Sequence, residues 1–512
     1  MGTLGRLAAR TPSAFLVSVA IVAGIFWLPR PGLASPFGFG RVGDLQFAGP
    51  ASTDLSSVHW NPAAVGARGG LELAVTLGGQ MTALSWARTP IDPATGLPAS
   101  GSPGARAFAT ARGNGNRLTP SPFAPGGFLG FSLSLGTRIS FGLAAYTPFA
   151  DRAHFADPDG ETSARYHTVS TDLRHLALVP AVSLRIAAGV RLGVTFGSLF
   201  SGARVVVDED TALSRPAATD CGGVPCGVEN PLAAERYDLA SGFGLLERSH
   251  SFTLSLGLHV TRPRYVLGLA YLAHAPGSDH ELSIDANTVS LTPAPRTGVA
   301  TPCPGIAPSR CASGTLFYRL PRLLMGEVRW LLGPAWQVGL LLQWAGLSAH
   351  DALRLRIKGP ASGALGALGF SEQLVLHRGL SDTFGAHLRA EVRLGAAVRL
   401  AFGLRGETSP LKTPQLSPAF IGGATLEPGA AVRIFPARWL ALTLGYAFTF
   451  TPTRSVELSA YDPGALAACA AAGGDLGSPA CAARRAGLAL PTAAGRYTRR
   501  DHHLRLSLSA TF

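Results

Sequence analysis

The chain has 512 residues, of which 47% are hydrophobic and 15% are charged, and its formal net charge is +13. This length is sufficient for several soluble domains or for one large barrel. A basic excess can indicate nucleic-acid binding, but the arginines here are spread along predicted strands and loops instead of one helix, so no nucleic-acid partner is expected.

The first 34 residues have the pattern of a signal peptide. Arg6 and Arg10 precede an apolar run from Ala14 to Trp27, and a small-residue segment then ends at Ala34. These are the three parts of a secretory signal, so we expect cleavage after Ala34, with an uncleaved anchor as the alternative. Elsewhere, charges or glycines interrupt each apolar stretch before the roughly 18 residues that a spanning helix needs.

Residues 35–69 precede the first predicted strand and contain Gly, Ala, Ser, Pro and Asp without strand alternation. The strands that follow predict a barrel whose lumen is too wide for small side chains to fill. We therefore predict that residues 35–69 form a small plug, or hatch, inside the lumen. A disordered periplasmic tail is the alternative.

Residues 70–512 carry a repeated alternation of apolar and polar side chains. It is clearest in segments 252–260, 384–394, 440–450 and 504–512. In segment 384–394, one face is apolar and the other carries His387, Arg389 and Glu391, which a polar lumen accepts more readily than an oily core. The last segment ends on Phe512, as expected of the closing strand of an outer-membrane barrel. A large soluble β-protein is the alternative.

The connections between the predicted strands are unequal in length. Short turns are expected at 136–138, 187–189, 262–264, 333–335, 395–396 and 435–437, and longer loops at 89–125, 149–165, 208–248, 286–314, 359–371, 409–418 and 460–493. Bacterial barrels have short periplasmic turns and longer extracellular loops. The sequence therefore predicts an all-β fold, a transmembrane antiparallel barrel of about 14 strands with the hatch inside it.

The six cysteines form three local pairs in loop-like stretches. They are Cys221 with Cys226, Cys303 with Cys311, and Cys469 with Cys481. In an exported chain such pairs are candidates for disulfides. A metal site is the alternative, but neither a C-x-x-C spacing nor a histidine partner supports it, so no metal is expected.

Several segments resemble the FadL-type long-chain fatty acid transporters. Residues 54–65 resemble the family's hatch, and Asn61, Pro62 and Ala63 match its Asn-Pro-Ala motif. Further resemblances occur in order at Phe141-Gly142 through Pro148-Phe149, Leu176 to Ile186, Leu320-Pro321, Trp344 and Ser409-Pro410. The chain departs from the family at Tyr271-Leu272-Ala273, where the family has Tyr-Arg-Ser, and in its shortened hatch.

The resemblance implies a bacterial outer-membrane protein that passes long-chain fatty acids or similar hydrophobic compounds by passive diffusion. It implies gating at Asn61, Pro62 and Ala63, lateral release, a monomer without cofactor, and contact with outer-membrane lipids including lipopolysaccharide. No recognisable nucleophile motif indicates an enzyme. A general porin and a structural or adhesive barrel are alternative functions, and fatty acid versus aromatic hydrocarbon stays open.

Pro148 has two interpretations. Proline lacks an N–H, so within a barrel strand it deletes a ladder bond. If the strand containing Phe141, Gly142, Pro148 and Phe149 continues past Pro148, the wall is kinked there, which in the family makes a side opening beside the hatch. Alternatively, Pro148 ends the strand and begins a loop.

Overall fold

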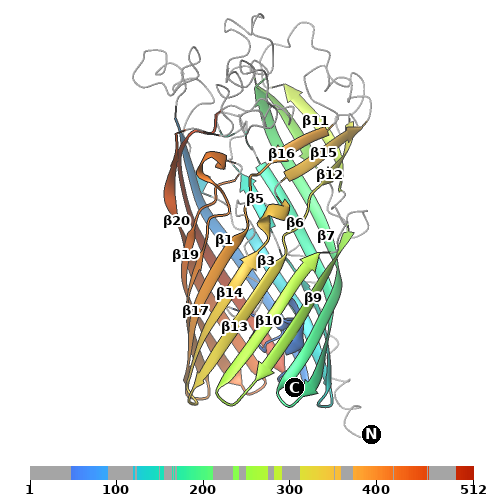
Figure 1. Cartoon of the computed structure of the whole chain (residues 1–512), viewed down its shortest axis with the longest axis vertical. Coiled ribbons are helices and arrows are strands. Elements are labelled where there is room, and N and C mark those ends of the chain that lie inside the picture. Colours follow the sequence, from blue (N-terminus) through green and yellow to red (C-terminus); the bar gives the residue numbers. More distant parts are fainter. Residues whose placement is uncertain are drawn as a thin grey trace, which may run out of the picture.

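The structure is a computed structural model of the chain (Figure 1). It describes residues 48–89, 119–120, 124–148, 150–154, 164, 167, 170–210, 234–240, 250–274, 282–290, 312–350, 352–358, 373–418, 420–457, 459 and 492–512.

Within these residues, fourteen antiparallel strands form the wall of a closed barrel, as the alternation predicts. They are β1 (Leu71–Arg88), β3 (Ala124–Leu135), β4 (Ile139–Tyr146), β6 (Ser170–Ala187), β7 (Val190–Asp210), β9 (His250–Thr261), β10 (Tyr265–His274), β13 (Leu323–Leu332), β14 (Trp336–Ala345), β17 (Thr383–Leu394), β18 (Val398–Glu407), β19 (Thr425–Ala437), β20 (Leu440–Val456) and β21 (Gly495–Thr511). Strand β1 pairs with β21 from Glu72↔Thr511 to Arg88↔Gly495, and this pairing closes the barrel.

Shorter strands extend the wall at one end of the barrel. They are β2 (Thr119–Pro120), β5 (Ala150–His154), β8 (Ala234–Ala240), β11 (Leu282–Ser290), β12 (Ala312–Phe317), β15 (Ala352–Lys358) and β16 (Gln373–His377). Strands β8, β11, β12, β15 and β16 continue the pairing that starts at β7, and together form an upper sheet (Figure 1). The prediction that 149–165, 208–248 and 286–314 are loops was therefore wrong in part. Pairing beyond the wall satisfies the backbone groups of these segments.

The short turns lie at the opposite end of the barrel and agree with the sequence to within one residue, except for the last. The predicted turn at 435–437 was wrong, because β19 runs to Ala437 and the turn falls at 438–439. A register shift between Ile434 and Ala437 accommodates Pro436 in the strand. A bulge of this kind tolerates a residue that lacks an N–H.

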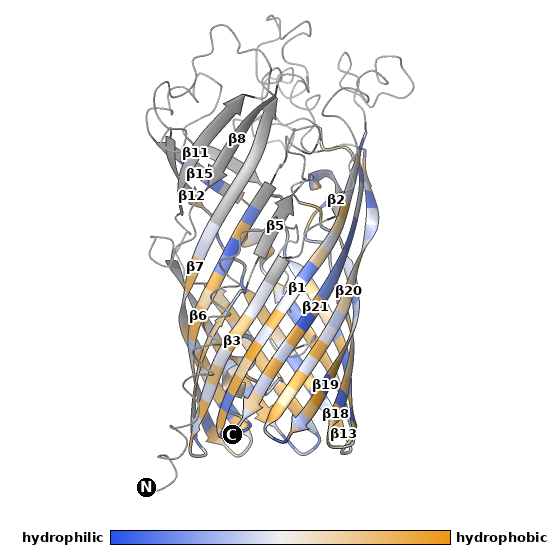
Figure 2. Ribbon diagram, turned by 180° about the vertical axis from the view of Figure 1, so that it is seen from behind, coloured by the Kyte–Doolittle hydropathy of each residue, from blue (hydrophilic) through white to orange (hydrophobic). Residues whose placement is uncertain are grey.

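The two faces of the wall have opposite chemistry. Large apolar side chains point outward, among them Phe384 at 62% exposure, and the lower half of the barrel is coloured as predominantly apolar in Figure 2. Trp330, Trp336 and Trp439 are exposed at the short-turn end, where Trp439 stacks on Phe512 at 5.7 Å. An apolar band edged by aromatic residues is the lipid-facing surface of a membrane barrel.

Inside the described wall, the two sides differ in side-chain size. The inner positions of β3, β4, β6, β7, β9 and β10 include many Gly, Ala and Ser, whereas those of β17, β18, β19 and β21 carry Arg, Glu, Asp and His. The small-residue side leaves room for a further segment of chain. Residues 48–66 occupy that room and contain the helices α3 (Ser57–Trp60) and η1 (Pro62–Ala64).

Two further 3₁₀ helices, η4 (Leu347–His350) and η5 (Thr413–Gln415), lie between wall strands. Among the described residues, no helix is both long and apolar enough to cross a membrane.

Candidate functional site

Residues 48–66, within the described part of the hatch, pack directly against glycines of the wall. A Cβ at Gly193 of β7 would lie 2.2 Å from the carbonyl carbon of Pro62, and one at Gly257 of β9 would lie 1.9 Å from Oδ1 of Asn61. At Gly268 of β10 it would lie 2.2 Å from the carbonyl of Pro50. Only a residue without a side chain permits such an approach. We call Gly193, Gly257 and Gly268 the glycine cradle.

Asn61 fixes the hatch above this cradle. It caps η1, where its Oδ1 accepts from the N–H of Ala63 at 3.1 Å. Its Nδ2 donates to the carbonyls of Pro50 at 2.7 Å and of Leu258 on β9 at 2.9 Å. One fully buried amide therefore joins the two ends of the hatch segment to the wall. Pro62 is suited to the first position of η1, because its missing N–H has no helical partner there.

An arginine holds the C-terminal end of the hatch. Arg191 of β7 donates to the carbonyls of Ala63 at 3.2 Å and Val65 at 3.3 Å, and also to the hydroxyls of Ser183 and Ser140. Ser183 of β6 adds a hydrogen bond to the same Ala63 carbonyl at 2.8 Å. Because three strands take part, this end of the hatch is tied to the wall at several points.

A buried ion pair holds the N-terminal end. Glu327 of β13 accepts from the N–H of Ala51 at 2.8 Å, and Arg329 donates to both Glu327 and the hydroxyl of Ser52. Both side chains are buried. We call Glu327 and Arg329 the hatch clasp.

Removing half of the clasp is expected to destabilise the protein strongly. The substitution Arg329→Met leaves the Glu327 carboxylate buried without its partner, which typically costs about 3–5 kcal/mol. The double substitution Glu327→Gln with Arg329→Met removes both charges and should recover much of the loss, as judged by the midpoint of thermal unfolding. Arg356→Met, at an exposed arginine of β15, is the control. Equal midpoints for the single and double variants would contradict the clasp.

Between the two tethered ends, the hatch places aromatic rings against β3 and β4. His59 of α3 contacts Trp60 edge-on at 4.6 Å and Tyr146 of β4 at 5.0 Å, and Tyr146 stacks on Phe128 of β3 at 6.1 Å. Within the described chain, Nδ1 of His59 has no hydrogen-bond partner. His59 lies inside the barrel and not in its wall, and burial lowers the pKa of its imidazole to about 3. The ring is therefore neutral at ordinary pH and packs as an aromatic group.

The wall ladder is interrupted beside these rings. β4 ends at Tyr146, which pairs with Ala177 of β6, and β5 resumes along β6 with Ala150 opposite Arg174. The register shifts by one residue across this break, which contains Pro148. In the described part of the chain, β5 pairs with β6 alone, whereas β3 pairs with β1 and β4. β4 therefore ends before Pro148, and pairing to β6 resumes beyond it in a shifted register; we call this irregularity the kink. That the wall opens sideways there stays a prediction.

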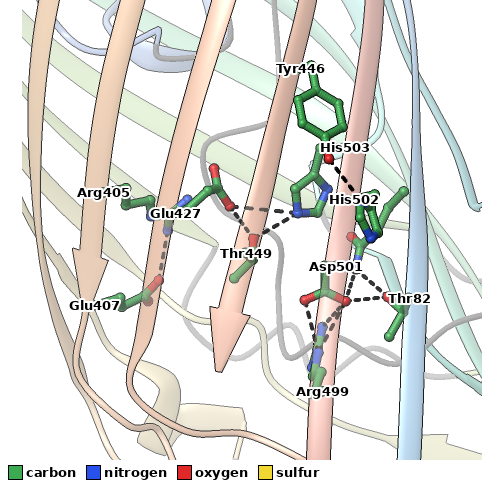
Figure 3. A network of polar contacts seen from close by, with 11 residues as sticks. Thr82, Arg405, Glu407, Glu427, Tyr446, Thr449, Arg499, Asp501, His502 and His503 are labelled. Atoms are coloured by element: carbon green, nitrogen blue, oxygen red, sulfur yellow. Dashed lines mark hydrogen bonds and ion pairs between the residues drawn. The ribbon is translucent and has the colours of Figure 1, made fainter. Parts of the chain in front are cut away.

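The opposite side of the lumen is filled by paired charges. Arg389 pairs with Glu391 on β17, Arg405 with Glu407 on β18, and Arg499 with Asp501 on β21, at 2.7, 2.8 and 3.0 Å. Figure 3 shows the last two pairs. It also shows Thr82, whose hydroxyl donates to Asp501, and Thr449, whose hydroxyl forms hydrogen bonds with Glu427 and His503. We call these three pairs the ion-pair belt, and their charges cancel. Arg433 of β19 and Arg505 of β21 are buried on the same side and add positive charge.

Residue spacing in the sequence could have identified these pairs. Residues i and i+2 of a strand share a face, so each Arg-x-Glu or Arg-x-Asp triplet on an inward face can form a pair along its own strand. The pairs Arg389–Glu391, Arg405–Glu407 and Arg499–Asp501 follow this rule, as does Glu327–Arg329 in reverse order. The inward charge of segment 384–394 was recognised, but not its pairing.

Buried apolar side chains form one cluster on the hatch side and upper part of the lumen. The cluster includes Leu55, Val58 and Trp60 of the hatch, Phe128 and Tyr146 beside the kink, Trp86 and Tyr497 of β1 and β21, and Leu347, Leu380, Leu416 and Phe420 near η4 and η5. Arg378 is buried here, over the ring of Phe420 at 3.9 Å and donating to Nε2 of His350 at 2.6 Å. Sequence reasoning did not single out Arg378 or His350, because no strand alternation surrounds them.

The predicted site residues lie in different parts of the structure. Asn61, Pro62 and Ala63 meet the glycine cradle, and Gly142 faces the hatch, whereas Phe141 points outward at 43% exposure. Pro148 is buried at the kink. Phe149 and the six cysteines lie outside the described residues, so the proposed disulfides are not tested. Within the described ranges, no group of three or more His, Cys, Asp or Glu could hold a metal ion.

A closed fourteen-strand barrel with a hatch packed inside its lumen defines a class of outer-membrane transport proteins. Residues 38–373 match the family model described as outer membrane protein transport protein (OMPP1/FadL/TodX), and the chain belongs to this family.

Solved structures agree on the fold. A Pseudomonas aeruginosa FadL homologue superposes with a TM-score of 0.68 at 16% identity, covering 94% of this chain and 100% of its own. The P. putida toluene transporter TodX gives 0.58 at 11% identity, with coverage of 90% and 95%. The CymD monoaromatic hydrocarbon channel gives 0.56 at 14%, with coverage of 93% and 99%. No curated protein sequence matches the chain.

Proposed function

We propose that this protein carries long-chain fatty acids or similar hydrophobic compounds across the bacterial outer membrane by passive, hatch-gated diffusion with lateral release. The observation that carries the proposal is the continuous apolar cluster, which extends from the upper lumen past the hatch to the kinked wall at Pro148. An alkyl chain gains roughly 0.8 kcal/mol for each CH₂ that leaves water. A sequence of apolar contacts therefore suits such a ligand better than an aqueous pore.

The ion-pair belt directs the ligand away from the barrel axis. An apolar molecule passing among Arg389, Glu391, Arg405 and Glu407 would strip water from charges without replacing their hydrogen bonds, which is costly. The small-residue side carries fewer charges, and Arg191 there already donates to carbonyls of the hatch. Lateral release through the kink, close to Phe141, Gly142, Pro148 and Phe149, is therefore the favoured exit in our proposal.

Asn61, Pro62 and Ala63 are proposed as the pivot of the gate. Both ends of the hatch are tethered, by the clasp at Ala51 and by Arg191 at Ala63. Residues 53–60 between them carry the rings that lie against Tyr146. Rotation of this middle part about the Asn61 turn would uncover the kinked wall while the tethers hold.

Because the structural neighbours include a FadL homologue, a toluene transporter and a monoaromatic hydrocarbon channel, the proposed substrate class stays open between fatty acids and aromatic compounds. We further propose a monomer that contacts outer-membrane lipids, including lipopolysaccharide, and uses no cofactor. An enzyme is not proposed, because the family consists of transport channels.

The test reconstitutes the full chain in liposomes and compares transfer of a labelled long-chain fatty acid, and of toluene, with sugar-driven swelling. Hydrophobic transfer without swelling is the expected result. Swelling without selective transfer would identify a general porin and would overturn the proposal. Absence of both would favour a structural or adhesive barrel.

A further inference from the structure

Three neighbouring short turns of the barrel carry exposed arginines. Arg138 lies on the β3–β4 turn, Arg185 at the lower end of β6, and Arg262 and Arg264 on the β9–β10 turn. We call these four residues the basic rim. They lie beneath the wall that holds the hatch, because β4, β6, β7, β9 and β10 are consecutive neighbours in the sheet.

Hydrogen bonds join the three turns into one surface. The N–H of Arg185 donates to the carbonyl of Arg138 at 2.7 Å, and the N–H of Thr261 donates to the carbonyl of Gly189 at 2.7 Å. The Arg262 guanidinium donates to the carbonyl of Ala188 at 2.9 Å. The four arginines therefore belong to a single connected edge of the barrel and not to independent loops.

The charge of this edge is not balanced locally. Segments 134–140, 184–192 and 260–266 contain neither Asp nor Glu. In the part of the chain that the structure describes, none of the four guanidinium groups forms an ion pair with a carboxylate. By contrast, the arginines of the ion-pair belt are paired along their own strands.

The basic rim borders the lipid-facing apolar band at Arg138 and Arg264. Leu135 and Ile139, on either side of the turn that carries Arg138, and Tyr265, next to Arg264, are exposed on the outside of the barrel. Arg185 lies on the opposite face of β6 from the outward Leu184 and Ile186, and is the cross-strand partner of Arg191. Arginine can keep its stem on apolar surface while its head reaches the polar interface. A basic surface continuous with an apolar one fits a lipid with an anionic headgroup, and not a soluble acidic protein.

We propose that the basic rim binds anionic phospholipid headgroups, such as phosphatidylglycerol, in the periplasmic leaflet next to the hatch wall. The proposal rests on the outer-membrane orientation of the proposed function, in which short turns face the periplasm. Guanidinium groups suit this role because they bind phosphate oxygens bidentately. A bound lipid would join three hairpins of the wall that carries Gly193 and Gly257.

The experiment measures phosphatidylglycerol binding to the purified full chain in neutral detergent, by the rise in unfolding temperature and by native mass spectrometry. Phosphatidylcholine is the lipid control. Arg262→Gln with Arg264→Gln is compared with Arg354→Gln with Arg356→Gln, an equally spaced exposed pair on β15 in the upper sheet. We expect affinity for phosphatidylglycerol to fall on the order of tenfold in the first variant only, and further when Arg138→Gln and Arg185→Gln are added.

Equal losses in the two double variants would reduce the effect to net charge and overturn the proposal. Equal binding of the two phospholipids would also overturn it, and so would displacement by millimolar inorganic phosphate, which would indicate a site for a free anion. These measurements involve no transport. Failure of the rim is therefore distinguishable from failure of the transport function.

Discussion

Joining the middle of the hatch to β4 is expected to stop ligand transfer. A Cβ at Gly142 would lie 3.2 Å from Cγ2 of Val58, and in a disulfide each Cβ lies about 3 Å from the partner sulfur. Val58→Cys with Gly142→Cys should therefore form a cross-link once the Val65 side chain shifts, because the new Cβ would lie 2.9 Å from Cγ1 of Val65. If residues 53–60 must swing away from the kinked wall, oxidised protein should lose at least about tenfold in transfer rate, and reduction should restore it.

The chain provides a matched control at the same wall position. The Gly142 Cβ would also lie 2.9 Å from Cγ1 of Val65, in the part of the hatch that Arg191 already holds. Val65→Cys with Gly142→Cys should cross-link equally well and leave transfer unchanged. Wild-type protein given the same reductant controls for the native cysteines. If both cross-links block transfer, the hatch moves as one body; if neither does, the ligand does not pass through a gate at α3.

Filling the glycine cradle is expected to convert the barrel into a leaky pore. At Gly193, a side chain would overlap Pro62 and Ala63, with its Cβ 2.2 Å from the nitrogen of Ala63. Overpacking of this kind costs about 1–3 kcal/mol even where side chains can adjust, and here it meets backbone. Gly193→Val should therefore displace the hatch while the wall stays closed. Sugar-driven swelling of liposomes should rise well above the wild-type background.

Gly126→Val on β3 controls for adding the same side chain to the wall. A Cβ at Gly126 meets no described atom within 4 Å, so the hatch should stay in place and swelling should stay low. Limited proteolysis at residues 48–66 reports hatch position independently in both variants. A folded Gly193→Val protein with a protected hatch and no swelling would show that the cradle does not hold the plug.

The sequence determined the barrel because strand alternation is local. Residues i and i+2 share a face whatever the rest of the fold does, so Leu504, Leu506 and Leu508 face outward, as their spacing predicts. The same period predicts the fourteen wall strands and most short turns. The alternation did not predict the turn after Pro436 correctly, because a bulge changes the register of β19 without changing its composition. It also could not separate wall from upper sheet, because β8 and β11 satisfy their backbone groups only through partners distant in sequence.

The location of the hatch was decided by tertiary structure. Gly193, Gly257 and Gly268 are separated by many residues, and only the pairing of β7 with β9 and β9 with β10 brings them beneath Asn61. Likewise, Glu327 reaches Ala51 only after the barrel closes. The Asn-Pro-Ala motif and Pro148 were visible in the sequence, whereas their partners were not. Composition and period fix which face of each strand is polar, but contacts across the lumen depend on barrel closure, for which no local pattern exists.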